Sequence, residues 1–194
     1  MTRLIAIPHS SSPREDRSHH NAAASRKSRA ERQSEAFTRL YREHYRQITG
    51  YLYRRTGRQD IAEDLAADTF TDAYRVFWRY RTTGAPISSW FFRIATNKAN
   101  AWLRRVKRGE IPPPQPTVDP EQTALQRERA EALYEALHKL PPEQQAVIAL
   151  ARFESLSHQE VAIALGVRIG TVKSRLNRAI ESLRQELEFL EGEP

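Results

Sequence analysis

The sequence contains no cysteine and a single methionine, and several classes of protein are excluded by what it lacks. Without cysteine the chain forms no disulfide and no cysteine-based zinc site, which fits a reducing compartment. No apolar run approaches the ~20 residues that a membrane span needs, and residues 1–8 are too short for the apolar core of a signal peptide. These absences favour a cytoplasmic protein that holds no metal or other cofactor.

Charge is abundant but unevenly distributed along the 194 residues. The formal net charge of +7 suggests a polyanionic partner. Residues 36–109 carry fifteen Lys or Arg against six Asp or Glu, whereas residues 128–194 carry eight against eleven. The basic part of the chain is therefore its middle, and its C-terminal part is acidic overall.

Apolar periodicity and proline divide the chain into four parts. Residues 1–34 have little apolar content and no period, so we expect a disordered, basic tail. Residues 35–109 and residues 124–194 have helical periodicity and predict two small all-α domains. Residues 110–123 include the sequence IPPPQPTVDP, which predicts a semi-rigid, Pro-rich linker between the two domains.

A helix-turn-helix is predicted in the C-terminal domain. Ser157 and Glu160 have the spacing of a capping box, so a helix should begin at His158, and Gly166 supplies the backbone freedom that ends it. We expect Thr171 to cap the next helix. The core side of that helix is predicted to be the apolar stripe Val172, Leu176, Ala179, Ile180, Leu183, Leu187 and Leu190.

The polar face of this second helix has the composition of a DNA-recognition surface. Thr171 and Ser174 are short hydrogen-bonding side chains at its start, and Arg178 follows one turn later, which suits base edges in the major groove. Lys173 and Arg175 flank them and suit phosphates. The alternative is an ordinary helical hairpin with a solvated polar face.

The first domain is predicted to contain three helices, over about residues 35–56, 59–80 and 88–108. The outer face of the second helix is mixed and partly acidic. It consists of Asp64, Ala67, Asp68, Thr71 and Arg75. This face is either a solvated surface or a docking surface for a protein, because carboxylates repel nucleic acid.

The outer face of the third helix interleaves amides with cations, which suits contacts with both phosphates and bases. It consists of Arg93, Asn97, Asn100, Arg104 and Lys107. Trp90 lies at the edge of this face, where it either stacks on an unpaired base or packs beside the preceding loop. On the inner side of the first helix, His44 is interpreted as a structural residue rather than a ligand.

Residues 36–187 resemble a bacterial RNA polymerase sigma factor of the small extracytoplasmic-function (ECF) group. Four segments carry the resemblance in the family's order: AFTRLYREHYRQITGYLYRRTG, DIAEDLAADTF, PISSWFFRIATNKANAWLRR and ALHKLPPEQQAVIALARFESLSHQEVAIALGVRIGTVKSRLNRA. The resemblance implies that the first domain docks on the clamp helices of the polymerase's largest subunits. It assigns Asp64 and Asp68 to that contact, on the face that also carries Ala67 and Thr71.

The resemblance also implies two contacts with promoter DNA. Residues 82–108 would open the −10 element and hold bases of the non-template strand. Residues 171–178 would enter the major groove of the −35 element. Arg168 departs from the family, which commonly has a small residue or proline there, and we expect it to add a phosphate contact at the turn. The Pro-rich linker would run toward the RNA exit path, and the sequence leaves open whether an anti-sigma factor binds the chain.

Two other functions compete with this interpretation. The helix-turn-helix also resembles the DNA-binding domain of response regulators, which would make the chain an autonomous transcription regulator, although it lacks their receiver domain. An enzyme acting on nucleic acid is not favoured, because no HExxH motif, P-loop, carboxylate pair or Ser/His/Asp set stands out. The sequence therefore predicts a non-enzymatic sigma factor.

Overall fold

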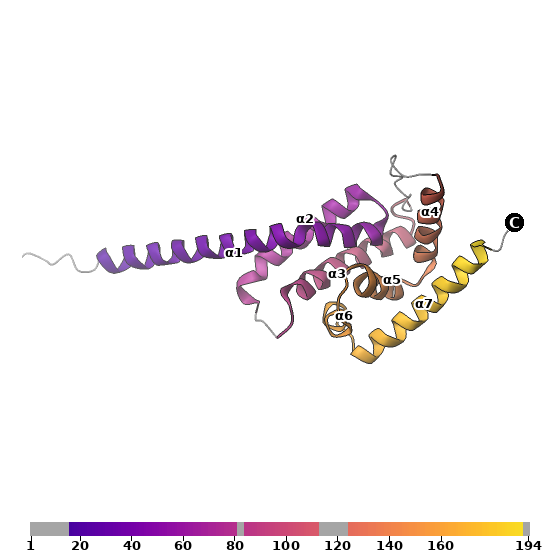
Figure 1. Ribbon diagram of the computed structural model, residues 1–194. Helices are drawn as coiled ribbons and strands as arrows, with labels where there is room; N and C mark the ends of the chain where they lie inside the picture. The colour runs from indigo at the N-terminus through magenta and orange to yellow at the C-terminus, as the bar shows by residue number, and fades with distance from the viewer. Residues whose placement is uncertain (1–15, 81–83, 113–123, 192–194) are drawn as a thin grey trace, which may run out of the picture. The chain divides into compact units, whose positions relative to one another are not determined.

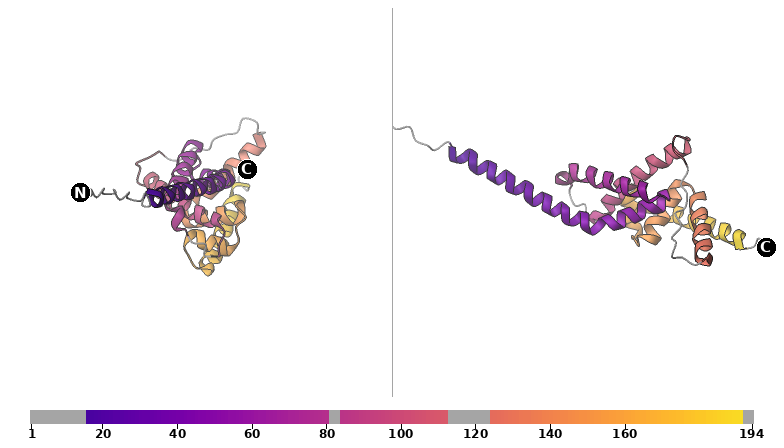
Figure 2. Two further views of the ribbon diagram at one scale, coloured as in Figure 1. Left: turned by 90° about the vertical axis from the view of Figure 1, so that its left-hand side faces the viewer. Right: turned by 90° about the horizontal axis from the view of Figure 1, so that it is seen from above.

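The computed structural model describes residues 16–80, 84–112 and 124–191, and every regular element within them is helical (Figures 1 and 2). Two compact units are distinguished, Met1–Arg39 and Leu40–Pro194. None of the helices in these ranges combines the length and the apolar composition that crossing a bilayer requires. The all-α class predicted from the periodicity is confirmed.

The first helices follow the predicted order: α1 (Asp16–Thr56), α2 (Gln59–Val76), the 3-10 turn η1 (Phe77–Arg79) and α3 (Ile87–Lys107). Gly57 separates α1 from α2 with φ +65°, a left-handed conformation that glycine adopts without a steric penalty. Apolar side chains of α1, α2 and α3 form the core of this part. Its fully buried members are Ile48, Tyr51, Leu52, Ala62, Ala66, Phe70, Ala73, Phe91, Phe92, Ala95 and Ala99.

The helix α1 begins much earlier than the sequence led us to expect. Disorder was expected over residues 1–34, and this expectation is wrong from Asp16 onward. Residues 22–32 are rich in Ala, Arg, Lys and Glu, which favour a helix through their intrinsic propensity even where little apolar surface is present. The remaining part of the expected tail, residues 1–15, lies outside the described residues.

The second set of helices is α4 (Ala124–Lys139), α5 (Pro142–Ile148), a π-helical turn η2 (Ala149–Phe153), α6 (His158–Leu165) and α7 (Ile169–Glu191). The helices α5, α6 and α4 pack against α7. Their buried centre includes Val147, Leu150, Val161, Val172 and Leu176. Most of the predicted Pro-rich linker falls on residues 113–123, which the structure does not describe.

Three details of the predicted helices are corrected. The helix α7 begins at Ile169, and Arg168 caps it through its backbone carbonyl, which accepts the N–H groups of Thr171 and Val172 at 2.9 and 3.2 Å. Ile180 is 38% exposed, because the buried stripe passes through Ala179 instead. The predicted helix over about residues 59–80 ends as an α-helix at Val76, whose side chain is 42% exposed.

The two sets of helices contact each other within the second unit. The helix α3 packs against α6, and α1 contacts η2 through an ion pair between Arg54 and Glu154. The guanidinium of Arg54 also lies 5.4 Å from the ring centre of Phe153. The carboxylate of Glu154 is almost fully buried, so it depends on Arg54 for its charge partner.

Candidate protein and nucleic-acid interfaces

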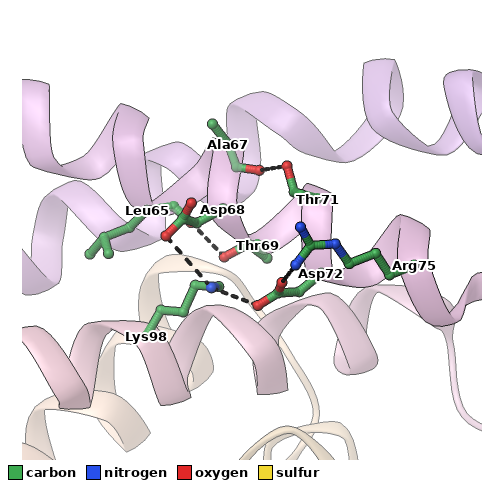
Figure 3. A network of polar contacts seen from close by, with 8 residues as sticks. All are labelled: Leu65, Ala67, Asp68, Thr69, Thr71, Asp72, Arg75 and Lys98. Atoms are coloured by element: carbon green, nitrogen blue, oxygen red, sulfur yellow. Dashed lines mark hydrogen bonds and ion pairs between the residues drawn. The ribbon is translucent and has the colours of Figure 1, made fainter.

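The predicted docking face of α2 is on the protein surface. Asp64, Ala67, Asp68 and Thr71 are all exposed. The hydroxyl of Thr71 donates to the carbonyl of Ala67 at 2.8 Å, so it is used within the helix. In Figure 3, Ala67 and Thr71 point away from α3, whereas Asp68 and Asp72 point toward it.

Lys98 of α3 holds the two carboxylates that point toward it. Its ammonium lies 2.7 Å from Asp72 and 3.7 Å from Asp68 (Figure 3). The hydrogen bond from Lys98 lowers the pKa of Asp72 below its usual range. Lys98 was not singled out from the sequence, since its role depends on the approach of two separate helices. The negative charge of this face is thus partly neutralised from within, while Asp64 has no ion pair among the described residues.

The predicted face of α3 is only partly open. Arg93, Asn97, Arg104 and Lys107 are exposed. Asn100 is half-buried, and its side-chain oxygen accepts a hydrogen bond from Arg55 at 2.9 Å. The exposed part of this face therefore presents three cations and the amide of Asn97, but not the amide of Asn100.

Arg55 is a functional candidate that sequence reasoning missed. It is 1% exposed and donates to the hydroxyl of Tyr51 at 3.1 Å, to Asn100, and to the carbonyl of Pro142 at 3.3 Å. It therefore connects the α3 face to the start of α5. In the sequence, Arg54 and Arg55 are two consecutive cations near the end of a helix. No local pattern indicates that Arg55 is the buried one.

A second contact places α3 beside the helix-turn-helix. The guanidinium of Arg93 lies 3.6 Å from the position that a Cβ on Gly166 would occupy. Gly166 has φ +66° and ends α6, as predicted. One cation of the α3 face thus borders the turn of the helix-turn-helix.

Trp90 is packed against other aromatic side chains. Its ring centre lies 4.7 Å from that of Tyr80 and 5.3 Å from that of Phe91. The side chain is half-buried. Of the two interpretations of Trp90, packing beside the loop agrees with these contacts. His44 likewise packs on Phe91, with ring centres 5.4 Å apart.

The helix-turn-helix has the local geometry that its sequence predicts. The Ser157 hydroxyl accepts the N–H of Glu160 at 3.3 Å, and the Glu160 carboxylate accepts the N–H of Ser157 at 2.8 Å, which completes the capping box. Along the following turn and α7 the predicted DNA-binding side chains are solvent-accessible. Arg168, Lys173, Ser174 and Arg178 are exposed, and Thr171 and Arg175 are half-exposed.

These side chains form a short basic patch on an otherwise acidic domain. The Ser174 hydroxyl donates to the carbonyl of Thr171 at 3.1 Å and can still accept a hydrogen bond. Further along α7, Glu181 and Glu188 pair with Arg184 at 3.2 and 3.3 Å. The basic patch is therefore confined to the start of α7. Over the described residues, no group of three His, Asp or Glu side chains is placed to hold a metal ion.

The chain matches two family models in separate segments. Residues 40–109 match Sigma-70 region 2, and residues 130–183 match Sigma-70 region 4. The RNA polymerase sigma factor YlaC of Bacillus subtilis is 33% identical over 156 residues, which cover 76% of this chain and 90% of YlaC. The ECF RNA polymerase sigma factor SigE of Mycolicibacterium smegmatis is also 33% identical over 156 residues, but they cover 60% of SigE.

A solved structure has the same fold. The sigma factor RpoE from Bartonella quintana, in complex with the anti-sigma factor NepR, superposes with a TM-score of 0.65 at 24% identity. The superposition covers 79% of this chain and 98% of RpoE. At this identity the likeness concerns the fold alone.

Proposed function

Because the chain belongs to the extracytoplasmic-function group of RNA polymerase sigma factors, we propose that it binds core polymerase and directs transcription from promoters with its own −35 and −10 elements. The observation that carries the proposal is the succession of a region 2 segment and a region 4 segment, the latter with an exposed basic helix start. In this role the chain acts with polymerase in the cytoplasm and catalyses no reaction itself.

We assign the parts of this role to separate domains of the chain. Residues 35–109 form the part that binds polymerase and the −10 element, and residues 124–194 form the part that binds the −35 element. Residues 110–123 connect them, and residues 1–34 precede both. The matched segments 40–109 and 130–183 support this division without defining its boundaries.

We assign the polymerase contact to α2. The clamp helices meet this face at Asp64, Ala67, Asp68 and Thr71. We expect the clamp surface to be basic because two of these four side chains are carboxylates. Exposure of all four side chains supports this assignment. Asp64 contributes the larger electrostatic part, since Lys98 already lies 3.7 Å from Asp68.

We assign promoter DNA to two other surfaces. At the −35 element, Thr171, Ser174 and Arg178 contact bases, while Arg168, Lys173 and Arg175 contact phosphates. At the −10 element, Arg93, Arg104 and Lys107 contact phosphates and Asn97 contacts a base. Asn100 and Trp90 position this surface rather than contact DNA, because Asn100 is hydrogen-bonded to Arg55 and Trp90 packs on Tyr80.

We further propose that an anti-sigma factor regulates the chain. The relative RpoE was solved with the anti-sigma factor NepR, and the two proteins share a fold. The alternative of an autonomous response-regulator-type protein is not supported, since residues 40–109 match Sigma-70 region 2 and not a receiver domain.

Transcription with purified core polymerase on a library of genomic fragments tests the proposal. The full chain should direct initiation at a common set of promoters, and Asp64→Lys with Asp68→Lys should abolish it by weakening core binding. The control is Glu31→Lys with Glu35→Lys, the same charge change at exposed positions outside both matched segments. Equal activity of the two double variants would contradict the assignment of the α2 face, and no initiation by the wild type would contradict the function.

A further inference from the structure

The outward row of side chains on α2 extends beyond the residues assigned so far. Ala67, Thr71 and Tyr74 follow one another at spacings of four and three residues, which places them in one row on α2. Trp78 comes four residues after Tyr74, in the 3-10 turn that continues α2. All four are exposed, Tyr74 to 46% and Trp78 to 57%. We call this row the outer ridge. The outer ridge runs from the predicted docking face at Ala67 and Thr71 to the aromatic side chains Tyr74 and Trp78.

The local structure keeps Trp78 in solvent. The α-helix ends at Val76, whose φ of −116° and ψ of 1° begin the 3-10 turn Phe77–Arg79. Within this turn Phe77 is half-buried, whereas Trp78 is the most exposed of the large apolar side chains in the described part of the chain. Tyr80, two residues further on, stacks on Trp90. Over residues 77–80, Phe77 and Tyr80 are thus half-buried while the indole of Trp78 is exposed.

Charges along the outer ridge change sign from one end to the other. Asp64 and Asp68 flank its beginning, and the exposed Arg75 and Arg79 flank its end. Arg75 lies 3.3 Å from Asp72, so Arg79 is the cation at this end without an ion pair among the described residues. A nucleic acid does not match this pattern, because its uniform negative charge is repelled by the first end. A protein helix with basic side chains at one end and acidic ones at the other does match it.

We propose that Trp78 is the apolar anchor of the polymerase contact and inserts into a hollow on the helical surface of core polymerase that Asp64 meets by charge. The inference rests on the proposed function and adds to it a residue that lies outside the assigned contact of Asp64, Ala67, Asp68 and Thr71. Exposed ion pairs contribute little to affinity, whereas a desolvated Trp in a pocket is among the strongest contributors to protein interfaces. Trp78 therefore carries more of the affinity for core polymerase than either carboxylate.

The test is a titration of full-length chain with bacterial core polymerase. A cysteine added after Pro194 takes a fluorophore specifically, because the chain has no other cysteine. Trp78→Ala should weaken binding by about tenfold or more, and Trp78→Phe should weaken it less, since an aromatic ring still fills the hollow. Asp64→Asn should have a smaller effect than Trp78→Ala. The matched control is Ile180→Ala, which removes an exposed apolar side chain from α7 and should leave the affinity unchanged.

Promoter opening distinguishes the protein partner from a nucleic-acid partner. With core polymerase in excess, so that all variants are assembled, permanganate footprints of the melted promoter should be the same for Trp78→Ala and the wild type. An unchanged core affinity with a weakened footprint would overturn the proposal and assign Trp78 to an unpaired base. Unchanged affinity and footprint would overturn it as well. If Asp64→Lys with Asp68→Lys still weakens core binding in that case, the proposed function stands and only the anchor fails.

Discussion

At the scale of single residues, the contact between Lys98 and the carboxylates of α2 sets the electrostatic character of the docking face. The folded chain presents less negative charge here than Asp64, Asp68 and the neighbouring Asp72 would give, because the Lys98 ammonium holds Asp68 and Asp72. Asp72 is half-exposed, so solvent screens this contact and its contribution to stability is modest. Its main effect is to leave Asp64, rather than Asp68 or Asp72, as the carboxylate available to a partner.

We expect Lys98→Met to raise the pKa of Asp72 toward its ordinary value, since the hydrogen bond from Lys98 is the largest cause of its lowering. A lowered folded pKa stabilises the fold above the ordinary pKa of an aspartate, and this stabilisation is lost as the pH falls through the folded value. The variant should therefore lose less stability than the wild type on acidification. Carboxyl titration by NMR measures the pKa directly.

Arg75→Gln is the control for that titration, because Arg75 is the last of the causes that lower the pKa of Asp72. It should move the pKa less than Lys98→Met does. An identical titration curve for Asp72 in the wild type and in Lys98→Met would show that the ammonium does not hold this carboxylate in solution.

At the scale of elements, helices were predictable where a local pattern specifies them. The capping box at Ser157 and the glycine at Gly166 are contained within a few residues, and both behave as predicted. Intrinsic propensity without an apolar stripe was underestimated, which is why the beginning of α1 at Asp16 was missed. Contacts between elements, such as Arg55 with Asn100 and Pro142, connect residues 45 and 87 positions apart and leave no local signal.

The helix α3 is expected to separate base contacts from phosphate contacts. Asn97→Ala should impair promoter opening at one position of the −10 element, where loss of a base contact is worth about 1–3 kcal/mol. Arg104→Ala should instead weaken binding to all sequences and reduce the salt slope by about one. Permanganate footprints and salt titrations of the assembled holoenzyme measure the two effects. Identical footprints for Asn97→Ala and the wild type would contradict the assignment of Asn97.

At the scale of the whole molecule, the proposed function requires a larger span than the compact unit provides. Elements centred near −35 and −10 lie 25 base pairs apart, or roughly 85 Å at about 3.4 Å per base pair. In the structure α3 packs directly against α6. A chain in this arrangement cannot contact both elements at once, so the two sets of helices must part on the promoter.

We expect the distance between α3 and α7 to increase when the holoenzyme binds its promoter. Ala101→Cys with Ser182→Cys places two labels at exposed positions outside the assigned contacts, on a chain without other cysteines. Energy transfer between the labels should be high in the free chain and low in the promoter complex. A pair of labels within α7, at Ser182→Cys and Asn177→Cys, should show no change. Equal transfer in both states for the first pair would contradict the separation.

Separation of the two sets of helices breaks the ion pair between Arg54 and Glu154 and one of the hydrogen bonds of Arg55. Of its three acceptors, Tyr51 and Asn100 belong to the first set of helices, and only the carbonyl of Pro142, at 3.3 Å, belongs to the second. When the halves part, the guanidinium gives up its longest bond and keeps the other two, so no buried cation is left without acceptors. The bond from Arg55 to Asn100 is kept, so the position of Asn100 on α3 does not depend on the contact with α5. Loss of the hydrogen bond to Pro142 therefore leaves the other contacts of Arg55, and with them the proposed −10 surface of α3, in place.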